Sequence, residues 1–321
     1  MSRDGDRAGP VVVVAGPTAS GKSALALDLA AAFDGEIVNA DSMQVYRELR
    51  ILTARPSPED EVRAPHHLYG VQSVAEVSSA GTWLRLATEA IGDICAHGRL
   101  PIVCGGTGLY MKVLMEGIAP VPDVPDDISE HARRLYDEEG GEAFRARLAV
   151  LDAAAAANLP AADSQRLIRA YAVVRATGRR LADWQAEQPD GPPLAARFFT
   201  IVLDPPRDAL YARIEARFDA MIAEGALDEV AALAPLGLAP ALPAMKALGV
   251  PDFLRHLAGE CDLADAVDKA KQGTRNFAKR QFTWFRHQMT PDLRLEAFGA
   301  DAVPDCMEAV REFIGAAGDV T

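Results

Sequence analysis

Short apolar runs separated by helical patterns organise the first part of this chain and return after its middle. The runs are Val11–Ala15, Glu36–Asn39, Leu100–Cys104 and Phe198–Leu203, each bounded by turn residues. Short apolar runs that alternate with amphipathic helices are typical of strands buried in a parallel sheet. The pattern therefore predicts an α/β fold with a doubly wound, mostly parallel sheet.

The middle of the chain has a different character. Pro120, Pro122 and Pro125 mark a linker, and helical patterns such as 128–139 and 165–177 then run without a convincing strand. Because strand signals resume afterwards, we expect an all-helical domain inserted into the sheet domain. The expected organisation is a first part of the core domain at residues 1–119, the helical insertion at 120–197, and the second part of the core at 198–321.

The residues between the first apolar run and the next helical stretch read GPTASGKS. Glycines in such a loop let backbone N–H groups turn inward, where they and the following helix N-terminus converge on a phosphate. The lysine adds a positive charge, and the last serine offers a hydroxyl to Mg²⁺. The alternative is a glycine turn that follows a strand by chance. The pattern predicts a P-loop that binds a diphosphate through Gly16, Pro17, Thr18, Ala19, Ser20, Gly21, Lys22 and Ser23, with Ser23 as the metal ligand.

Two further loops follow predicted strands and should meet the P-loop at the carboxyl edge of the sheet. The first contains Asp41, whose carboxylate could accept a proton from an attacking group or hold a metal through water. A helix N-cap is the structural alternative for this residue. The second loop is Gly105–Gly108, in which Thr107 could donate to a phosphate oxygen. Its glycines permit close approach of a ligand, but tight packing of a helix on a strand requires the same residues.

The overall charge is acidic, yet basic residues gather in two segments. The formal net charge is −13, which would ordinarily count against a polyanionic partner. Between Lys269 and Arg286 the chain has basic and aromatic residues and no acid, and a second basic group lies within 166–180. These segments predict two surfaces for a phosphate backbone. A solvated basic helix face is the alternative for either one.

The sequence also bears on the setting of the protein. No apolar stretch approaches the roughly 20 residues needed to cross a bilayer, and the N-terminus lacks the apolar centre of a signal peptide. We therefore expect a cytoplasmic protein with no membrane partner, acting as a monomer. The four cysteines are scattered without metal-binding spacing, which argues against a zinc site or a disulfide framework.

Several motifs in a fixed order carry a resemblance to a known family. They are GPTASGKS at 16–23, DSMQVYR at 41–47, PHHL at 65–68, GGTGLY at 105–110, LDPPRDALYARIEARFD at 203–219, KALG at 246–249 and TRNFAKRQFTWFR at 274–286. A P-loop alone occurs in many unrelated enzymes, whereas the later motifs in this order do not. Over most of its length the chain resembles the tRNA dimethylallyltransferase family, also called the tRNA isopentenyltransferases.

This resemblance implies transfer of a dimethylallyl group from dimethylallyl diphosphate to the exocyclic amine of the adenine 3′ to the anticodon in tRNA, with release of diphosphate. Lys22, the P-loop amides and Mg²⁺ bound by Ser23 would stabilise the leaving group. Arg217 matches a family arginine at the same diphosphate. Asp41 would accept the amine proton, and Thr107 would position the base once it leaves the stack.

The resemblance also implies a set of tRNA contacts, with the helical insertion closing over the anticodon stem as an RNA clamp. Three departures fall near them: Ser164 replaces a proline, Val250 and Pro251 replace a Tyr-Arg pair, and Ser129 stands where relatives often carry a basic residue. These departures concern RNA affinity and not the diphosphate clamp. The implied tRNA-binding residues are Asp41, Ser42, Met43, Gln44, Thr107, Gln165, Arg166, Leu167, Ile168, Arg169, Lys246, Lys279, Arg280, Gln281, Trp284 and Arg286.

Two functions of other classes compete with this interpretation. A P-loop kinase for a nucleoside or small metabolite would use Asp204, which follows the last strand-like run, as a magnesium ligand and the helical insertion as a lid. A nucleotide-switched RNA-binding protein would need no transfer chemistry. The kinase has little use for the aromatic and basic segment near the C-terminus, and the switch leaves Asp41 and Thr107 without roles. The transferase is therefore the favoured hypothesis.

Overall fold

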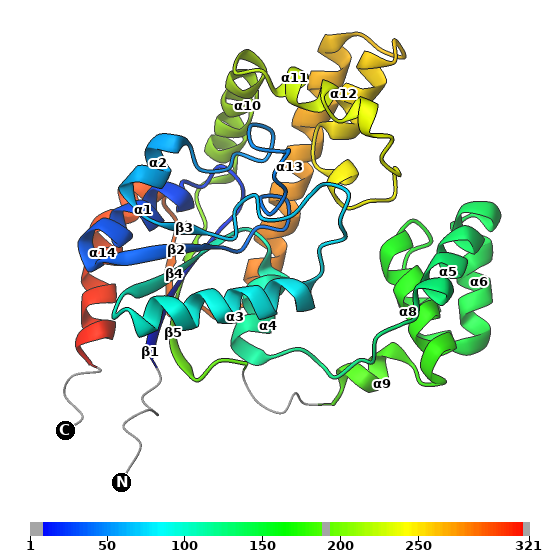
Figure 1. The fold of residues 1–321 in the computed structure, drawn as a ribbon, viewed down its shortest axis with the longest axis horizontal. Helices are drawn as coiled ribbons and strands as arrows, with labels where there is room; N and C mark the ends of the chain where they lie inside the picture. The colour runs from blue at the N-terminus through cyan, green and yellow to red at the C-terminus, as the bar shows by residue number, and fades with distance from the viewer. Residues whose placement is uncertain (1–8, 188–192, 317–321) are drawn as a thin grey trace. The chain divides into compact units, whose positions relative to one another are not determined.

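The computed structural model describes residues 9–187 and 193–316, and its strands form one parallel sheet (Figure 1). The sheet has six strands in the order β3-β2-β4-β1-β5-β6. They are β1 (Gly9–Ala15), β2 (Gly35–Asn39), β3 (His66–His67), β4 (Leu100–Gly105), β5 (Ala196–Leu203) and β6 (Leu293–Leu295). The predicted α/β fold and its four predicted strands are confirmed. Sequence patterns did not predict β3 and β6, because strands this short leave no apolar run.

The central strand β1 lies between β4 and β5 and is buried on both faces. Its residues from Val11 to Ala15 are 0% exposed. Because side chains alternate along a strand, Val11 and Val13 join the hydrophobic cluster on one face, and Val12 and Val14 join the cluster on the other. This double burial explains the unbroken apolar run.

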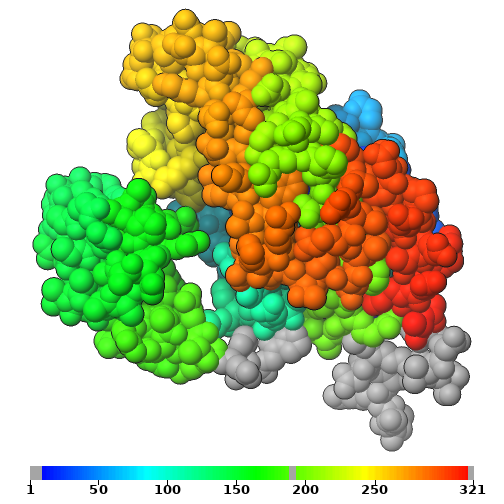
Figure 2. Space-filling model, turned by 180° about the vertical axis from the view of Figure 1, so that it is seen from behind, coloured from blue at the N-terminus to red at the C-terminus, as the bar shows by residue number. Residues whose placement is uncertain are grey.

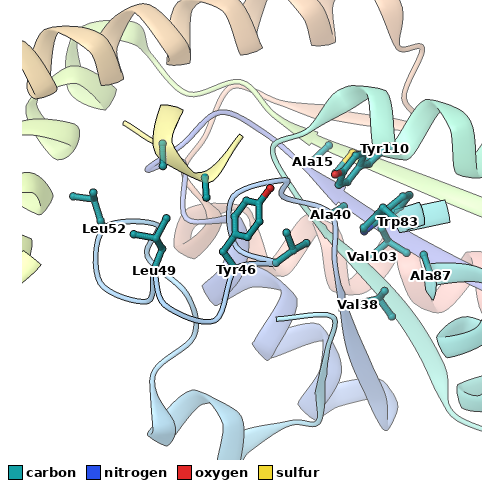
Figure 3. Close-up of a cluster of buried hydrophobic side chains, with 14 of the residues drawn as sticks. Ala15, Val38, Ala40, Tyr46, Leu49, Leu52, Trp83, Ala87, Val103 and Tyr110 are labelled. Atoms are coloured by element: carbon teal, nitrogen blue, oxygen red, sulfur yellow. The ribbon is translucent and has the colours of Figure 1, made fainter. Parts of the chain in front are cut away.

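Helices cover both faces of the sheet. One face packs on α1 (Lys22–Phe33) and α14 (Gly299–Gly315), and the other on α3 (Ala80–Ala96) and α4 (Gly108–Glu116). On the second face the Trp83 ring stacks on Tyr110 with centroids 4.5 Å apart, within the cluster drawn in Figure 3. The Trp83 indole N–H donates to the carbonyl of Asn39, the last residue of β2, at 2.7 Å. A short helix, α2 (Pro58–Arg63), precedes β3.

The chain after β5 forms a second group of helices, which belong to the same compact unit as the sheet. They are α10 (Arg207–Ala223), α11 (Ala226–Ala231), α12 (Val250–Leu257) and α13 (Leu263–Gln288), with two 3-10 turns, η1 (Ala234–Leu236) and η2 (Ala244–Lys246). Figure 2 shows α13 in orange with α10 beside it. The two helices pack through Leu210, Ile214, Ala278 and Phe282. None of the described helices has both the length and the apolar character to cross a membrane.

The chain folds into two compact units, one formed by Met1–Met115 with Pro193–Thr321 and the other by Glu116–Pro192. In the described part of the second unit, residues 116–187, the regular elements are helices. They are α5 (Asp126–Glu139), α6 (Gly141–Leu151), α7 (Ala153–Asn158), α8 (Ser164–Thr177) and α9 (Leu181–Gln185). Phe144, Leu148 and Leu167 are 0% exposed at its centre. The helical unit thus has a core of its own, as expected of a domain.

Candidate active site

The P-loop connects β1 to α1 at the carboxyl end of the central strand. Gly21, which precedes α1, has a left-handed φ of 87°, and a Cβ on it would lie 2.9 Å from the Gly299 nitrogen. The Gly299 N–H donates to the Ser20 carbonyl at 2.9 Å, so the start of α14 supports the loop. Because Gly21 has no side chain to cap α1, the first amides of that helix are available to an anion.

A cavity of about 350 Å³ lies against this loop. Arg213 and Arg217 reach it from α10, where they are one helical turn apart. The described lining contains three cationic side chains and no carboxylate, which is the composition of an anion-binding site. The lining residues are Ala19, Gly21, Lys22, Ser23, Ala54, Arg213 and Arg217.

The cations of this cavity are close together and partly removed from water. Burial lowers the pKa of Lys22, and the Arg217 charge lowers it further, while Asp41 acts in the opposite direction. Burial also lowers the pKa of Arg217, again opposed by Asp41. Lys22 Nζ donates to the Pro17 carbonyl at 3.3 Å, and Arg217 Nη2 donates to Thr18 Oγ1. A bound anion with several negative charges would offset both the repulsion and the burial.

Ser23 is an exposed residue of the cavity wall in the first turn of α1. Burial raises the pKa of the neighbouring Cys104 thiol to about 11, while the Lys22 charge and the Ser23 side chain act in the opposite direction. Cys104 is therefore protonated at neutral pH. Within residues 9–187 and 193–316, no group of three or more His, Cys, Asp and Glu side chains could hold a metal ion. A metal at Ser23 would need further ligands from a bound anion and water.

Asp41 lies in the loop that follows β2, and the buried side chain of Asn39 shapes that loop. Asn39 Oδ1 accepts from the Asp41 N–H at 2.8 Å, and its Nδ2 donates to the carbonyls of Asp41 and Leu68, each at 3.0 Å. Asp41 Oδ1 accepts from the Met43 N–H at 2.9 Å. No helix begins here, so the N-cap alternative is wrong and the carboxylate instead forms an Asx turn.

Thr107 joins the Asp41 loop to the loop after β4. Its Oγ1 accepts from the Ser42 N–H at 2.9 Å and donates to Ser42 Oγ at 3.3 Å. The Thr107 N–H donates to the Ala40 carbonyl at 3.0 Å. The two loops that carry Asp41 and Thr107 are therefore hydrogen-bonded to each other.

The glycines around Thr107 fit close packing of the chain on itself. A Cβ on Gly105 would collide with the Ala40 backbone, one on Gly106 with the Gln281 amide, and one on Gly108 with the Trp284 ring. The structure therefore supports the packing alternative for these glycines. Trp284 and Gln281 belong to α13, which approaches the loop closely because no side chain intervenes.

The basic residues of α13 divide into two groups. Lys271 pairs with Asp219 at 2.5 Å and Arg275 pairs with Glu215, so these two cations join α13 to α10. Lys279 and Arg280 are exposed. Lys271 and Arg275 are therefore paired within the protein and do not belong to a solvated basic face. The exposed pair is the part that could meet a phosphate backbone.

The remaining sequence-predicted RNA contacts occupy varied positions. Gln44 donates to the carbonyls of Thr53 and Ala54, each at 2.8 Å, and Lys246 is exposed at the end of η2. On α8 of the helical unit, Gln165, Arg166 and Arg169 are exposed, whereas Leu167 is 0% exposed and Ile168 packs partly against the same core. Gln281 is 5% exposed. The side chains of Leu167 and Gln281 thus face the protein interior.

The three departures from the family pattern have defined positions. Ser164 is the first residue of α8, whose N-cap is Asp163; the Asp163 side chain accepts from the Arg166 N–H at 3.3 Å. Val250 is buried at the start of α12, and Ser129 lies half-buried in α5. A capped helix therefore begins at Ser164 without the family's proline.

Asp204, on which the kinase alternative depends, has two arginine neighbours. Its Oδ2 lies 3.4 Å from Arg294 Nη1 and 3.7 Å from Arg286 Nη2, and its side chain is 15% exposed. A carboxylate balanced by two guanidinium groups is a poor magnesium ligand. The position of Asp204 therefore does not favour a kinase.

Two site residues lay outside the sequence-based prediction. Arg213 could have been found, because it precedes Arg217 by one helical turn within the quoted motif. Asn39 could not, since a polar residue at the end of a strand gives no sign of which carbonyls it will bind.

Two models of protein families match this chain. The IPP transferase family model matches residues 44–288, and the isopentenyl transferase model matches residues 9–74. The chain is 55% identical over 283 residues to a tRNA dimethylallyltransferase of Rhodospirillum rubrum, covering 88% of this chain and 87% of that protein. It is 51% identical over 306 residues to one of Rhodospirillum centenum, covering 95% and 96% respectively.

Solved structures give the same result. The tRNA isopentenylpyrophosphate transferase of Bacillus halodurans is 29% identical, with a TM-score of 0.70 over 98% of this chain and 99% of that one. A eukaryotic dimethylallyltransferase crystallised in action on tRNA is 24% identical, with a TM-score of 0.78 over 96% of this chain and 80% of that one, and supports the fold. On the extent of the family match and the identity to its members, the chain belongs to the IPP transferase family, the tRNA dimethylallyltransferases.

Proposed function

We propose that the protein transfers a dimethylallyl group from dimethylallyl diphosphate to the exocyclic amine of the adenine 3′ to the anticodon of tRNA. The observation that carries this proposal is the cavity with Lys22, Arg213 and Arg217, beside the linked loops of Asp41 and Thr107. The Asp41 carboxylate acts to raise the pKa of both Lys22 and Arg217. The Asp41 carboxylate is therefore within electrostatic reach of two of the cations that line the cavity.

The donor half of the reaction needs a stabilised leaving group. The allylic carbon–oxygen bond breaks and its electron pair leaves with the diphosphate, so positive charge around the departing oxygens lowers the barrier. Lys22, Arg217 and the first amides of α1 would supply this charge. We add Arg213 to the same group because it lines the same cavity.

The acceptor half needs a positioned amine. The nitrogen lone pair forms the new carbon–nitrogen bond, and the amine proton passes to the Asp41 carboxylate, which balances the transfer. One Asp41 oxygen accepts the Met43 amide, and this hydrogen bond would fix the carboxylate's direction. Thr107, held by Ser42, would orient the base.

Mg²⁺ is part of this proposal. The Ser23 hydroxyl on the cavity wall fits the family's use of a P-loop serine, and the diphosphate and water would complete the shell. When bound, the ion would neutralise charge on the diphosphate. Transfer should fall when EDTA removes the ion and return when Mg²⁺ is added back. Transfer at full rate in EDTA would exclude this role.

The RNA substrate would lie along exposed basic residues. An adenine within an anticodon loop must leave its stack to reach a cavity, and single-stranded loops permit this at low cost. Lys279 and Arg280 on α13, and Gln165, Arg166 and Arg169 on α8, offer exposed polar and charged groups for the backbone. We also propose that the protein works in the cytoplasm and that it is a monomer. Light scattering in the presence and absence of RNA would test its oligomeric state.

A direct assay tests the function. The protein is incubated with Mg²⁺, dimethylallyl diphosphate and an anticodon stem-loop, and the RNA is examined by mass spectrometry. We expect a five-carbon addition that disappears when guanine replaces the target adenine. Absence of the addition on both the stem-loop and a full tRNA, or phosphorylation of a small acceptor by ATP, would contradict the proposal.

A further inference from the structure

The side chain of Gln281 connects two loops of the candidate active site. Its Oε1 accepts from the Thr18 N–H of the P-loop at 2.8 Å, and its Nε2 donates to the Gly106 carbonyl at 2.9 Å. The residue is 5% exposed. Its amide is thus used at both ends by partners 263 and 175 residues away in sequence.

These contacts are part of a chain of hydrogen bonds that runs from the cation-lined cavity to the Asp41 loop. Thr18 accepts from Arg217 of the cation-lined cavity through its hydroxyl. Gly106 precedes Thr107, which is bonded to Ser42 beside Asp41. One amide therefore lies between the groups proposed to hold the diphosphate and those proposed to hold the base.

The chemistry of the two partners selects glutamine. One partner is a donor and the other an acceptor, and a carboxamide presents one group of each kind in a fixed plane. Leaving a buried amide or carbonyl unpaired is destabilising. A side chain on Gly106 would also occupy the space of the Gln281 amide, so the close approach of α13 requires glycine at this position.

We propose that Gln281 is a positioning residue for prenyl transfer, which sets the P-loop and the Thr107 loop at the separation the reaction requires. This inference rests on the proposed transferase function. It differs from the RNA contact that the family resemblance implies for Gln281, because both ends of this side chain are hydrogen-bonded within the protein and only 5% of the residue is exposed.

Matched variants separate these roles. Gln281→Met keeps the length of the side chain and removes both hydrogen bonds. Gln281→Glu keeps the acceptor for Thr18 and loses the donor to Gly106 until the carboxylate takes up a proton. Gln288→Met and Gln288→Glu are the controls, because Gln288 is an exposed residue of the same helix that accepts from Lys112. RNA Kd, donor KM, kcat at saturating RNA and Tm are measured for all four.

We expect Gln281→Met to lower kcat about 10- to 100-fold, as loss of alignment does, with RNA Kd within about twofold of the parent. Burial raises the pKa of a carboxylate, so the activity of Gln281→Glu relative to the parent should increase as the pH falls. The Gln288 variants should match the parent in all of these quantities.

Three results would overturn the inference. One is a raised RNA Kd with unchanged kcat, which would make Gln281 an RNA contact. Another is a lower Tm with unchanged kcat, which would make it structural only. The third is a ratio of Gln281→Glu activity to parent activity that does not change with pH. This test remains available even if Gln281→Met does not fold. Loss of product in the parent and the Gln288 variants as well would instead contradict the proposed function.

Discussion

The two halves of the candidate active site, proposed to hold the donor and the acceptor, contain different kinds of chemical group. The donor half consists of backbone amides and the cations Lys22, Arg213 and Arg217 around a cavity. The acceptor half consists of short polar side chains, chiefly Asp41, which is hydrogen-bonded within its own loop, and Thr107, which is hydrogen-bonded to the Asp41 loop. Charge should therefore dominate binding in the first half and alignment in the second. Substitutions in the two halves should change different kinetic constants.

The largest effect is expected in the donor half. Lys22→Met removes a cation from beside the leaving group, and loss of one such electrostatic contact typically lowers the rate about 10²- to 10³-fold. We expect a loss in kcat/KM at the upper end of this range, with RNA Kd unchanged in a filter-binding assay. A parent-like donor KM and kcat would mean that the cavity does not hold the diphosphate.

The next effect tests the acceptor half. Asp41→Ala should lower transfer at least ~10²-fold, as is typical for loss of a general base, and leave RNA affinity intact. Asp41→Asn retains an acceptor for the Met43 amide, so it separates proton transfer from loop shape. If Asp41→Asn transfers the prenyl group at the parent rate in single-turnover experiments, Asp41 is not the base.

Thr107→Val should have a smaller effect in the same half. It leaves the Ser42 N–H without its partner, and an unmade hydrogen bond of this kind costs about 1 kcal/mol or more. We expect kcat to fall roughly tenfold while donor KM stays constant. Thr107→Ser is the control because it keeps the hydroxyl, and a loss in Thr107→Ser equal to that in Thr107→Val would assign the effect to the methyl group.

The smallest effect on chemistry is expected outside both halves. Replacing Lys279 and Arg280 by Ala should weaken RNA binding and reduce the slope of log K against log salt by about 0.7 for each lost phosphate contact. At saturating RNA, kcat should be unchanged. Binding with an unaltered salt slope would identify the pair as a solvated helix surface.

The sequence predicted the strand, the loop and the helix of the donor half because these elements are local. A strand, a glycine loop and a helix start follow one another within 9–33, and each has a pattern that is visible without the rest of the chain. The apolar runs of β1, β2, β4 and β5 were likewise visible because burial on both faces requires continuous apolar residues. By contrast, β3 and β6 arise from pairing between distant segments.

The acceptor half and its supports were less visible from the sequence. Asp41 and Thr107 were candidates because their loops follow predicted strands, but local patterns left a helix N-cap and tight packing as alternatives. Their roles toward the amine and the base were implied by the family resemblance. The structure excludes the N-cap and explains the glycines by the approach of Gln281 and Trp284. No local pattern connects Gln281 to Thr18, because their contact depends on how α13 folds back on the sheet.

The hydrogen bond from Gly299 to Ser20 has a consequence for biosynthesis. The phosphate loop is among the first parts of the chain to be made, but its supporting amide comes from near the end. Arg213, Arg217 and the start of α14 must all leave the ribosome before the donor cavity has its full wall. A nascent chain that stops short of residue 299 therefore carries the P-loop motif without the finished pocket.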